Sequence, residues 1–324
     1  MSAARSTVLI PGGINARVRE RVEAEFDAVS ISTADAALMT PEARAKISGI
    51  ACSTVITADF IDAFPNLSII ASFGVGYDAV DASHAATRGI MVTNTPDVLS
   101  DEVADTTVGL LLNTLRELPK AEAYLRAGRW AADGPYPLTS LTLRGRTVGI
   151  FGLGRIGLAI ARRLEAFGLP IHYHTRTKRN DVDYPWHDSL GGLAAAVDTL
   201  IVVVPGGAAT EKAVNADILG ALGPQGVLIS VGRGSTIDEP ALIAALADRK
   251  IAAAGLDVFA DEPNVPQALM ELPNVSLLPH VASASVSTRN AMADLVVDNL
   301  AAWLDGRPAI TAVPECAGFN RKPG

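Results

Sequence analysis

Short apolar runs alternate with polar, helix-compatible segments along the N-terminal third of the chain. The apolar runs fall at residues 7–10, 27–31, 49–55, 67–72 and 90–92. Between them, residues 17–25, 41–46 and 58–64 have the spacing of helices, and Thr40 followed by Pro41 is typical of a helix start. This alternation predicts the strand and helix rhythm of an α/β fold.

The same rhythm returns in the second half of the chain. Strands are expected at residues 147–151, 171–174, 199–204, 226–231, 251–258 and 275–278. Their nearly continuous apolar character is typical of parallel strands that are covered on both faces. Two long amphipathic helices are also predicted, one from Ser100 to about Leu118-Pro119 and one over residues 288–304.

The most informative stretch is residues 147–168, TVGIFGLGRIGLAIARRLEAFG, which combines a strand, a glycine-rich turn and an amphipathic helix. Gly152 permits the tight turn, Gly154 lets the backbone approach a pyrophosphate, and Gly157 lets the helix pack close to the strand. A pyrophosphate then lies on the helix N-terminus, where unpaired N–H groups attract anions. The turn therefore predicts a dinucleotide site formed by Gly152, Leu153, Gly154, Arg155, Ile156 and Gly157.

The two long helices suggest where the chain divides. We expect a discontinuous outer domain of residues 1–98 and 288–324, and an inserted dinucleotide-binding Rossmann domain of residues 99–287. The predicted fold class is α/β, with two Rossmann-like or flavodoxin-like domains, each with a parallel sheet. The active site is expected in the cleft between these domains.

Composition and charge narrow the classes of partner. The net charge of −8 argues against nucleic-acid binding, which depends on clustered cations. No apolar run approaches the roughly 18 residues of a spanning helix, and the first residues lack an export signal. Cys52 and Cys316 offer neither a disulfide framework nor metal spacing. We therefore expect a cytoplasmic protein without a metal, a membrane partner or a nucleic-acid partner.

The segment after the second predicted cofactor strand indicates which dinucleotide binds. Sites for NAD place a carboxylate about 20 residues after the glycine turn, whereas a 2′-phosphate favours arginine. Here the residues are Thr175, Arg176 and Thr177, followed by Lys178 and Arg179, and no carboxylate occupies the position. We predict a preference for NADP(H), with NAD(H) as a weaker alternative. The other interpretation is an exposed basic loop.

Three polar residues follow apolar strands beyond the glycine turn and fit the reduction of a 2-keto acid. Arg233 can grip the carboxylate and carbonyl oxygens in one plane, and this polarises the carbonyl. His280 can protonate the new alkoxide, and Glu262 can orient the imidazole and stabilise its charged form. Taken singly, each residue is more commonly structural: a surface arginine, a loop carboxylate and a packed histidine.

Together these motifs closely resemble the D-isomer-specific 2-hydroxyacid dehydrogenases over most of the chain, in order and spacing. They are the glycine turn, residues 73–78, residues 231–234, residues 255–263 and residues 278–280. Residues 136–157 and 299–306 look most like the glyoxylate/hydroxypyruvate and hydroxyphenylpyruvate reductase branch. The resemblance implies the same roles for Arg233, Glu262 and His280. It also implies further cofactor contacts from Thr107, Val204, Pro205, Val231, Gly232, Asp257, His280 and Ala282.

Substrate contacts are expected from Ser53 and from the loop Phe73, Gly74, Val75 and Gly76, together with Arg233 and His280. The glycines of that loop can expose consecutive N–H groups to an anion. One departure from the family pattern is Gly206-Gly207-Ala208, where the family often has leucine and threonine after the proline. This leaves the contacts of that loop open.

The motifs and the resemblance leave two classes of function. The first is an NADPH-dependent reductase of small 2-keto acids, and the second is a non-catalytic, dinucleotide-sensing corepressor of the same fold. The presence of Arg233, Glu262 and His280 favours the enzyme. Glu262 also argues against a formate dehydrogenase, because the formate dehydrogenase branch of the family resembles this site but has a glutamine at the position of Glu262. The aromatic segment 121–143, with Tyr124, Trp130 and Tyr136, fits either the monomer core or the contact of a homodimer.

Overall fold

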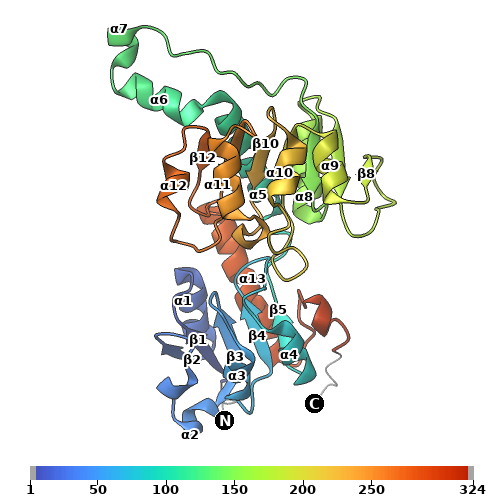
Figure 1. Ribbon diagram of the computed structural model, residues 1–324. Helices are drawn as coiled ribbons and strands as arrows, with labels where there is room; N and C mark the ends of the chain where they lie inside the picture. The colour runs from blue at the N-terminus through green and yellow to red at the C-terminus, as the bar shows by residue number, and fades with distance from the viewer. Residues whose placement is uncertain (1–4, 320–324) are drawn as a thin grey trace. The chain divides into compact units, whose positions relative to one another are not determined.

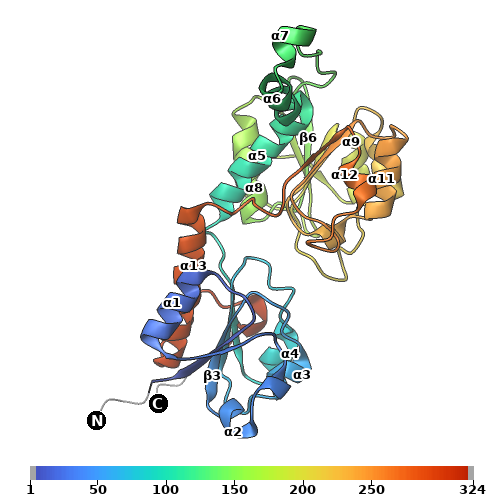
Figure 2. The ribbon, with the colours of Figure 1, turned by 90° about the vertical axis from the view of Figure 1, so that its left-hand side faces the viewer.

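The computed structural model describes residues 5–319 as two compact units. One unit takes the chain up to Leu99 and again from Ser285, and the other is Ser100–Ala284. Each unit has its own parallel sheet with helices on both faces, as Figures 1 and 2 show. This confirms the predicted α/β class with two parallel sheets.

The sheet of the first unit has the strand order β2-β1-β3-β4-β5. Its strands are β1 (Thr7–Pro11), β2 (Asp27–Ile31), β3 (Ile47–Cys52), β4 (Ile69–Ser72) and β5 (Met91–Thr93). The side chains of β1, β4 and β5 are all buried, whereas those of the edge strand β2 are half-buried or exposed. The strands other than β2 therefore appear in the sequence as nearly continuous apolar runs, because both of their faces are covered.

Two helices from opposite ends of the chain cover one face of this sheet. Figure 2 shows α1 (Ala16–Glu25) beside α13 (Val286–Leu304), and α13 also packs on β3 and β4. The remaining helical elements of the unit are α2 (Pro41–Arg44), α3 (Ala58–Asp62), α4 (Ala82–Thr87), and the short 3₁₀ turns η1 (Ala36–Leu38) and η3 (Pro314–Cys316). The C-terminal segment returns to β5, where Thr93 forms an antiparallel bridge with Ala312.

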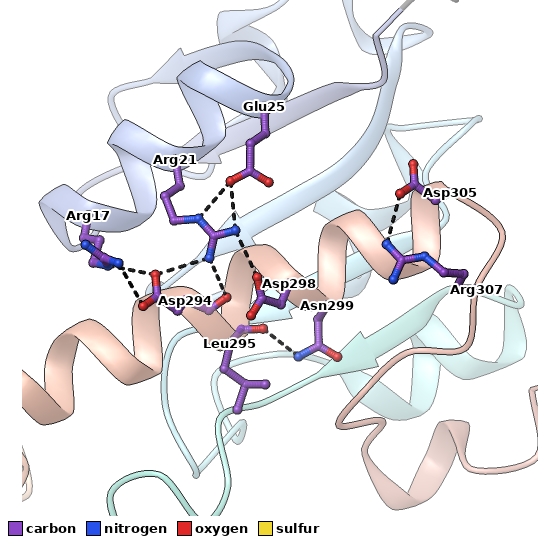
Figure 3. A network of polar contacts seen from close by, with 9 residues as sticks. All are labelled: Arg17, Arg21, Glu25, Asp294, Leu295, Asp298, Asn299, Asp305 and Arg307. Carbon is purple, nitrogen blue, oxygen red and sulfur yellow. Dashed lines mark hydrogen bonds and ion pairs between the residues drawn. The ribbon is translucent and has the colours of Figure 1, made fainter.

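A network of ion pairs joins α1 to α13 (Figure 3). Arg17 Nε donates to Asp294 Oδ1 at 2.7 Å, and Arg21 Nη1 donates to the same oxygen at 3.2 Å. Arg21 also pairs with Glu25 at 2.8 Å and with Asp298 at 2.9 Å. Arg21 therefore links carboxylates on both helices and ties the C-terminal helix to the N-terminal one.

The sheet of the second unit has the strand order β12-β11-β10-β9-β6-β7-β8. Its strands are β6 (Val148–Phe151), β7 (Ile171–His174), β8 (Trp186–His187), β9 (Thr199–Val202), β10 (Val227–Ser230), β11 (Ala253–Leu256) and β12 (Val275–Leu277). Each neighbouring pair is parallel. Their carboxyl ends therefore lie along one edge of the sheet, the edge where ligands bind in open α/β folds.

The helices of the second unit form a layer on each face of this sheet. On one face α5 (Ser100–Arg116) packs on α8 (Arg155–Glu165), and on the other α9 (Leu190–Ala196), α10 (Ala216–Leu222) and α11 (Glu239–Ala247) lie together (Figures 1 and 2). The other helical elements of this unit are α6 (Leu118–Arg126), α7 (Arg129–Asp133), the 3₁₀ turn η2 (Gly234–Thr236) and α12 (Gln267–Met270).

The long predicted helices differ from the observed ones at their ends. Helix α5 ends at Arg116, and α6 begins at Leu118, with Pro119 in its first turn. Proline suits the first turn of a helix, where its missing N–H has no partner to lose, so Pro119 starts a helix and does not only end one. Helix α13 begins at Val286, two residues before the predicted Thr288, because Ser285 caps it by accepting from the Thr288 N–H at 3.2 Å.

The aromatic segment contributes only partly to packing within the monomer. Tyr124 and Tyr136 pack edge to face, with ring centroids 5.4 Å apart. Trp130 is 62% exposed and Leu138 is 98% exposed, so neither belongs to the core of the unit. Among residues 5–319, no helix is long and apolar enough to cross a membrane.

Candidate active site

The glycine turn lies between β6 and α8, where each glycine meets different surroundings. Gly152 has φ +101°, a left-handed conformation that favours glycine. A Cβ at Gly157 would clash with the Gly152 carbonyl oxygen, whereas a Cβ at Gly154 would meet no atom within 4 Å. Gly157 is therefore needed for the close contact between helix and strand, and Gly154 leaves open space at the start of the helix.

The N-terminus of α8 has no side-chain cap. Gly154 occupies the cap position without a side-chain hydrogen bond, and Leu158 N is the first N–H to reach back to its carbonyl, at 2.9 Å. The N–H groups of Arg155, Ile156 and Gly157 point out of the first turn, as in any helix. An uncapped helix start beside an open glycine fits a pyrophosphate, so these residues can hold a dinucleotide.

The loop after β7 is held in a fixed shape by its own polar contacts. Thr175 Oγ1 donates to Thr177 O at 2.7 Å, and Trp186 Nε1 donates to Thr175 O at 3.1 Å. Arg179 Nη1 reaches the glycine turn and donates to Leu153 O at 2.6 Å. Arg176 is exposed on this loop. The sequence predicted the basic residues of this loop but not the link through Arg179. That link depends on a contact between the loop after β7 and the glycine turn after β6.

The segments after β9 and β10 lie against each other. A Cβ at Gly232 would lie 2.7 Å from Val204 O, and this close approach brings the predicted contacts Val204, Pro205, Val231 and Gly232 together. A Cβ at Gly234 would overlap the carbonyl group of Phe259, so the β10 loop also packs directly on the β11 loop. The half-buried Arg233 stands between these two glycines, and its Nη1 donates to Gly232 O at 2.9 Å.

His280 and Glu262 form a hydrogen-bonded pair. His280 Nδ1 lies 2.6 Å from Glu262 Oε2, and Glu262 Oε1 accepts from the Phe259 N–H at 2.9 Å. An ionised carboxylate only accepts, so Nδ1 carries the proton and Nε2 is the nitrogen left for a ligand. The His280 side chain is 46% exposed and that of Glu262 is 33% exposed, so solvent or a ligand can reach the pair.

Asp257 holds the loop that carries His280. Its carbonyl accepts from His280 N at 2.9 Å, and its carboxylate oxygens accept from Val281 N at 2.7 Å and Ala282 N at 2.9 Å. These bonds support His280 at φ 53°, a left-handed conformation that is uncommon outside glycine. Burial raises the pKa of the Asp257 carboxyl, and the two backbone N–H groups oppose that shift by stabilising the ionised form.

Asp257 therefore has a positioning role that the sequence did not reveal, because the residues it holds lie more than 20 positions away. Thr106 was missed for the same reason: its hydroxyl donates to Ala282 O at 3.2 Å and links α5 to the same loop. The predicted cofactor contact Thr107 is buried, and its hydroxyl donates to Val103 O within the helix at 2.6 Å.

A cavity of about 270 Å³ lies beside the His280 and Glu262 pair. Its other walls are mainly apolar and include Phe259, Val265 and Met270. Sequence patterning did not predict this cavity, because it forms only where residues 259–270 fold against residues 277–280. It gives one side of the imidazole–carboxylate pair an apolar environment, in which ionic hydrogen bonds are stronger than in water.

The predicted substrate residues lie in the other unit, at the ends of neighbouring strands. Ser53 follows β3 and Phe73 follows β4, and these strands pair in register at Cys52 and Ser72. Ser53 Oγ donates to Gly13 O at 2.8 Å, and Phe73 N donates to Cys52 O at 2.8 Å. The structure thus brings Ser53 together with the loop of residues 73–76 within one unit. Arg233, Glu262, His280 and the predicted cofactor residues all belong to the unit Ser100–Ala284.

The remaining histidines have local partners. His172 Nδ1 lies 3.0 Å from His187 Nε2, His174 Nδ1 lies 2.8 Å from His187 O, and His84 Nε2 lies 2.8 Å from Asp62. Burial, and then the nearby His187, lower the pKa of His172. Within the described part of the chain, no group of His, Cys, Asp and Glu side chains is arranged to hold a metal ion.

The chain is similar in sequence to a family of enzymes and to several of its characterised members. Residues 108–282 match the D-isomer specific 2-hydroxyacid dehydrogenase, NAD binding domain family. Hydroxyphenylpyruvate reductase of Plectranthus scutellarioides is 48% identical over 79% of this chain and 81% of its own. Glyoxylate/hydroxypyruvate reductase A of Arabidopsis thaliana is also 48% identical, with the same coverage.

A solved structure extends the similarity to nearly the whole chain. The NADPH-dependent glyoxylate/hydroxypyruvate reductase of Sinorhizobium meliloti, in complex with NADP and malonate, is 64% identical. It superposes with a TM-score of 0.96 over 98% of this chain and 99% of that chain. The glycine turn, the strand-end residues and these relatives agree: the chain belongs to the D-isomer-specific 2-hydroxyacid dehydrogenase family, in its glyoxylate/hydroxypyruvate reductase branch.

Proposed function

We propose that the protein reduces a small 2-keto acid of the glyoxylate or hydroxypyruvate type to the D-2-hydroxy acid with NADPH. The observation that carries the proposal is the His280 Nδ1 to Glu262 Oε2 contact of 2.6 Å, on the sheet edge that also holds the glycine turn. Carbonyl reduction needs a hydride donor and a proton donor. The dinucleotide site can hold the first, and His280, held by the Glu262 carboxylate, can act as the second.

Each of the three polar residues has a separate task in this proposal. His280 donates a proton from Nε2 to the carbonyl oxygen as that oxygen becomes an alkoxide. Glu262 holds Nδ1 and stabilises the imidazolium, and Phe259 N in turn fixes the other carboxylate oxygen. Arg233 binds the substrate carboxylate and polarises the carbonyl, because a guanidinium presents several donors in one plane.

The cofactor supplies the hydride that is transferred to the carbonyl carbon. The residues proposed to hold it are the turn from Gly152 to Gly157 and the loop from Thr175 to Thr177, with Thr107, Val204, Pro205, Val231, Gly232, Asp257 and Ala282 around the remainder of the site. NADP(H) is preferred because Thr175 and Arg176 occupy the place where an NAD site has a carboxylate. NAD(H) remains a weaker alternative cofactor.

We further propose that the two units are the substrate-binding and dinucleotide-binding domains. Ser53 and residues 73–76 would then contribute the substrate contacts of the first domain. Exposed Trp130 and Leu138 support a homodimer, because aromatic and other apolar side chains are enriched in the buried centre of protein interfaces. Two buried free cysteines are compatible with the cytosol, a reducing compartment.

The test is to follow NADPH oxidation with glyoxylate, hydroxypyruvate and hydroxyphenylpyruvate. We expect turnover with at least one of them, and a loss of kcat of roughly 10²–10⁴-fold in His280→Ala, the usual range for a general acid. Glu262→Gln keeps the shape of the side chain and removes its charge, so it should give a smaller loss. An unchanged rate in His280→Ala would remove this residue from the mechanism.

The second candidate, a dinucleotide-sensing binding protein, predicts the opposite result. It would bind NADPH without oxidising it in the presence of any 2-keto acid. The named relatives do not favour it, since all three are reductases. NADPH binding without turnover in the wild-type protein would support it over the reductase.

A further inference from the structure

The loop of residues 73–76 is held from one side by the segment that follows β5. Strands β4 and β5 pair in register at Ala71 and Thr93, so the chain segments after them run side by side. Asn94 Nδ2 donates to Val75 O at 2.7 Å, and Thr95 N donates to Gly74 O at 2.8 Å. Two consecutive carbonyl groups of the loop therefore point toward the same segment.

The planarity of the peptide bond fixes what lies on the opposite side of this loop. In a trans peptide, the N–H of each residue points away from the carbonyl of the residue before it. The Val75 N–H therefore points away from Thr95, and the Gly76 N–H points away from Asn94. Among residues 5–319, neither N–H donates a hydrogen bond to the protein. Two adjacent N–H groups that face the same way form a site for an anion.

The backbone of Asn94 is held independently of its side chain. Its N–H donates to Thr311 O at 3.3 Å, and its carbonyl accepts from Thr311 Oγ1 at 2.7 Å. Next to it, Thr93 is bridged to Ala312. Replacing the Asn94 side chain thus removes the bond to Val75 and leaves the contacts of the backbone in place.

We propose that Asn94 is a positioning residue for the substrate carboxylate. Its side-chain amide fixes the Val75 carbonyl so that the N–H groups of Val75 and Gly76 both face the carboxylate of the 2-keto acid. This rests on the proposed function for the identity of the ligand. The role differs from that of Arg233, because Asn94 touches the loop and not the substrate.

Asn94→Ala tests the proposal. Without the Asn94 side-chain amide, the peptide that joins Val75 to Gly76 can rotate. The Gly76 N–H then points away from the anion for much of the time. We expect KM for the 2-keto acid to rise about tenfold, which corresponds to about 1.4 kcal/mol. We expect kcat to change less than about threefold and NADPH affinity to stay the same, since the residue acts on carboxylate binding alone.

A second measurement does not depend on turnover. The affinity of malonate for the NADP-loaded protein, measured by calorimetry, should fall in Asn94→Ala by about the same factor as KM rises. Asn94→Asp has the same shape but presents an acceptor to the Val75 carbonyl, so it should weaken malonate at least as much. Asn66→Ala is the matched control, because Asn66 Nδ2 likewise donates to a carbonyl of this unit, Ala45 O at 2.6 Å, away from the loop.

The outcomes separate this proposal from the proposed function. KM and malonate affinity within about twofold of wild type in both Asn94 variants would overturn the role of Asn94. An equal loss of malonate affinity in Asn66→Ala would also overturn it, because it would show a general loosening of the unit. If the wild-type protein reduces no 2-keto acid but Asn94→Ala still weakens malonate, the proposed function fails and the positioning role stands.

Discussion

Gly154 and Gly157 stand three residues apart in one turn, yet a methyl group added to each would have a different effect. At Gly157 it would strike the Gly152 carbonyl, and at Gly154 it would enter open space. At the scale of single residues, the same amino acid thus protects the packing of the unit in one place and leaves room for a ligand in another.

This difference gives a paired prediction. Gly157→Ala should lower the free energy of unfolding by about 1–3 kcal/mol, the usual cost of overpacking. Gly154→Ala should leave it within about 0.5 kcal/mol, as for other substitutions at open surface positions, but weaken NADPH at least tenfold, because its methyl group occupies the space proposed for the pyrophosphate. Urea denaturation and fluorescence titration measure the two effects. Tight NADPH binding by Gly154→Ala would contradict the proposed cofactor position.

Arg176 allows a second prediction at this scale. Arg176→Ala should lower kcat/KM with NADPH at least tenfold and change the value with NADH less than about threefold, because only NADPH carries the 2′-phosphate. Arg307→Ala, which removes an exposed arginine of the other unit, is the control. Equal losses with both cofactors would show that the loop after β7 does not read the phosphate.

At the scale of elements, the pairing of α1 with α13 depends on pH through Asp294. The hydrogen bond from Arg17 holds the pKa of the Asp294 carboxyl below its usual value, although partial burial opposes this. A lowered pKa in the folded state means that the stabilisation is fully present above the usual value of about 3.9. It is lost as the pH falls through the lowered pKa.

We therefore expect Asp294→Asn to be about 0.5–1 kcal/mol less stable than wild type at pH 7, a value limited by the exposure of the pair to solvent. The difference should shrink as the pH falls below the usual carboxyl pKa and through the lowered pKa of Asp294. Chemical denaturation across this range provides the measurement, with Asp305→Asn in the exposed pair at the far end of α13 as control. A difference that stays constant down to the lowest pH would exclude the ion pairs as its source.

The sequence predicted elements well where one local pattern determines them. The residue pattern predicted β2 and β7 with their observed ends, because a short run of strand-forming residues is a local signal that needs no information from distant parts of the chain. Helices α6 and α7 were not predicted, because a proline such as Pro119 can mark the end of one helix as easily as the start of the next. The hydrogen-bond partners of Asn94 and Asp257 could not be predicted either. Each residue bonds to a loop that is distant in the sequence and becomes its neighbour only when the sheet has formed.

At the scale of the whole molecule, the exposed apolar side chains of the segment after α5 support self-association. Trp130→Ser combined with Leu138→Asp should convert a dimer into a monomer, as measured by light scattering or sedimentation, because a charge at the centre of an interface is costly. Phe167→Ser removes another exposed aromatic of the same unit and is the control. A monomeric wild-type protein would reject the proposed homodimer.

The division of the chain into units also has a consequence for its synthesis. The unit Ser100–Ala284 is continuous, whereas the other unit needs α13 and the segment that bridges β5, both of which follow Ala284 in the chain. On the ribosome, the middle of the chain can thus complete its fold while the strands made first still lack their covering helix. Nascent chains usually finish domains from the N-terminus onward. Here β1 to β5 are made before the helix that covers them, so one face of their sheet stays uncovered until α13 has been made.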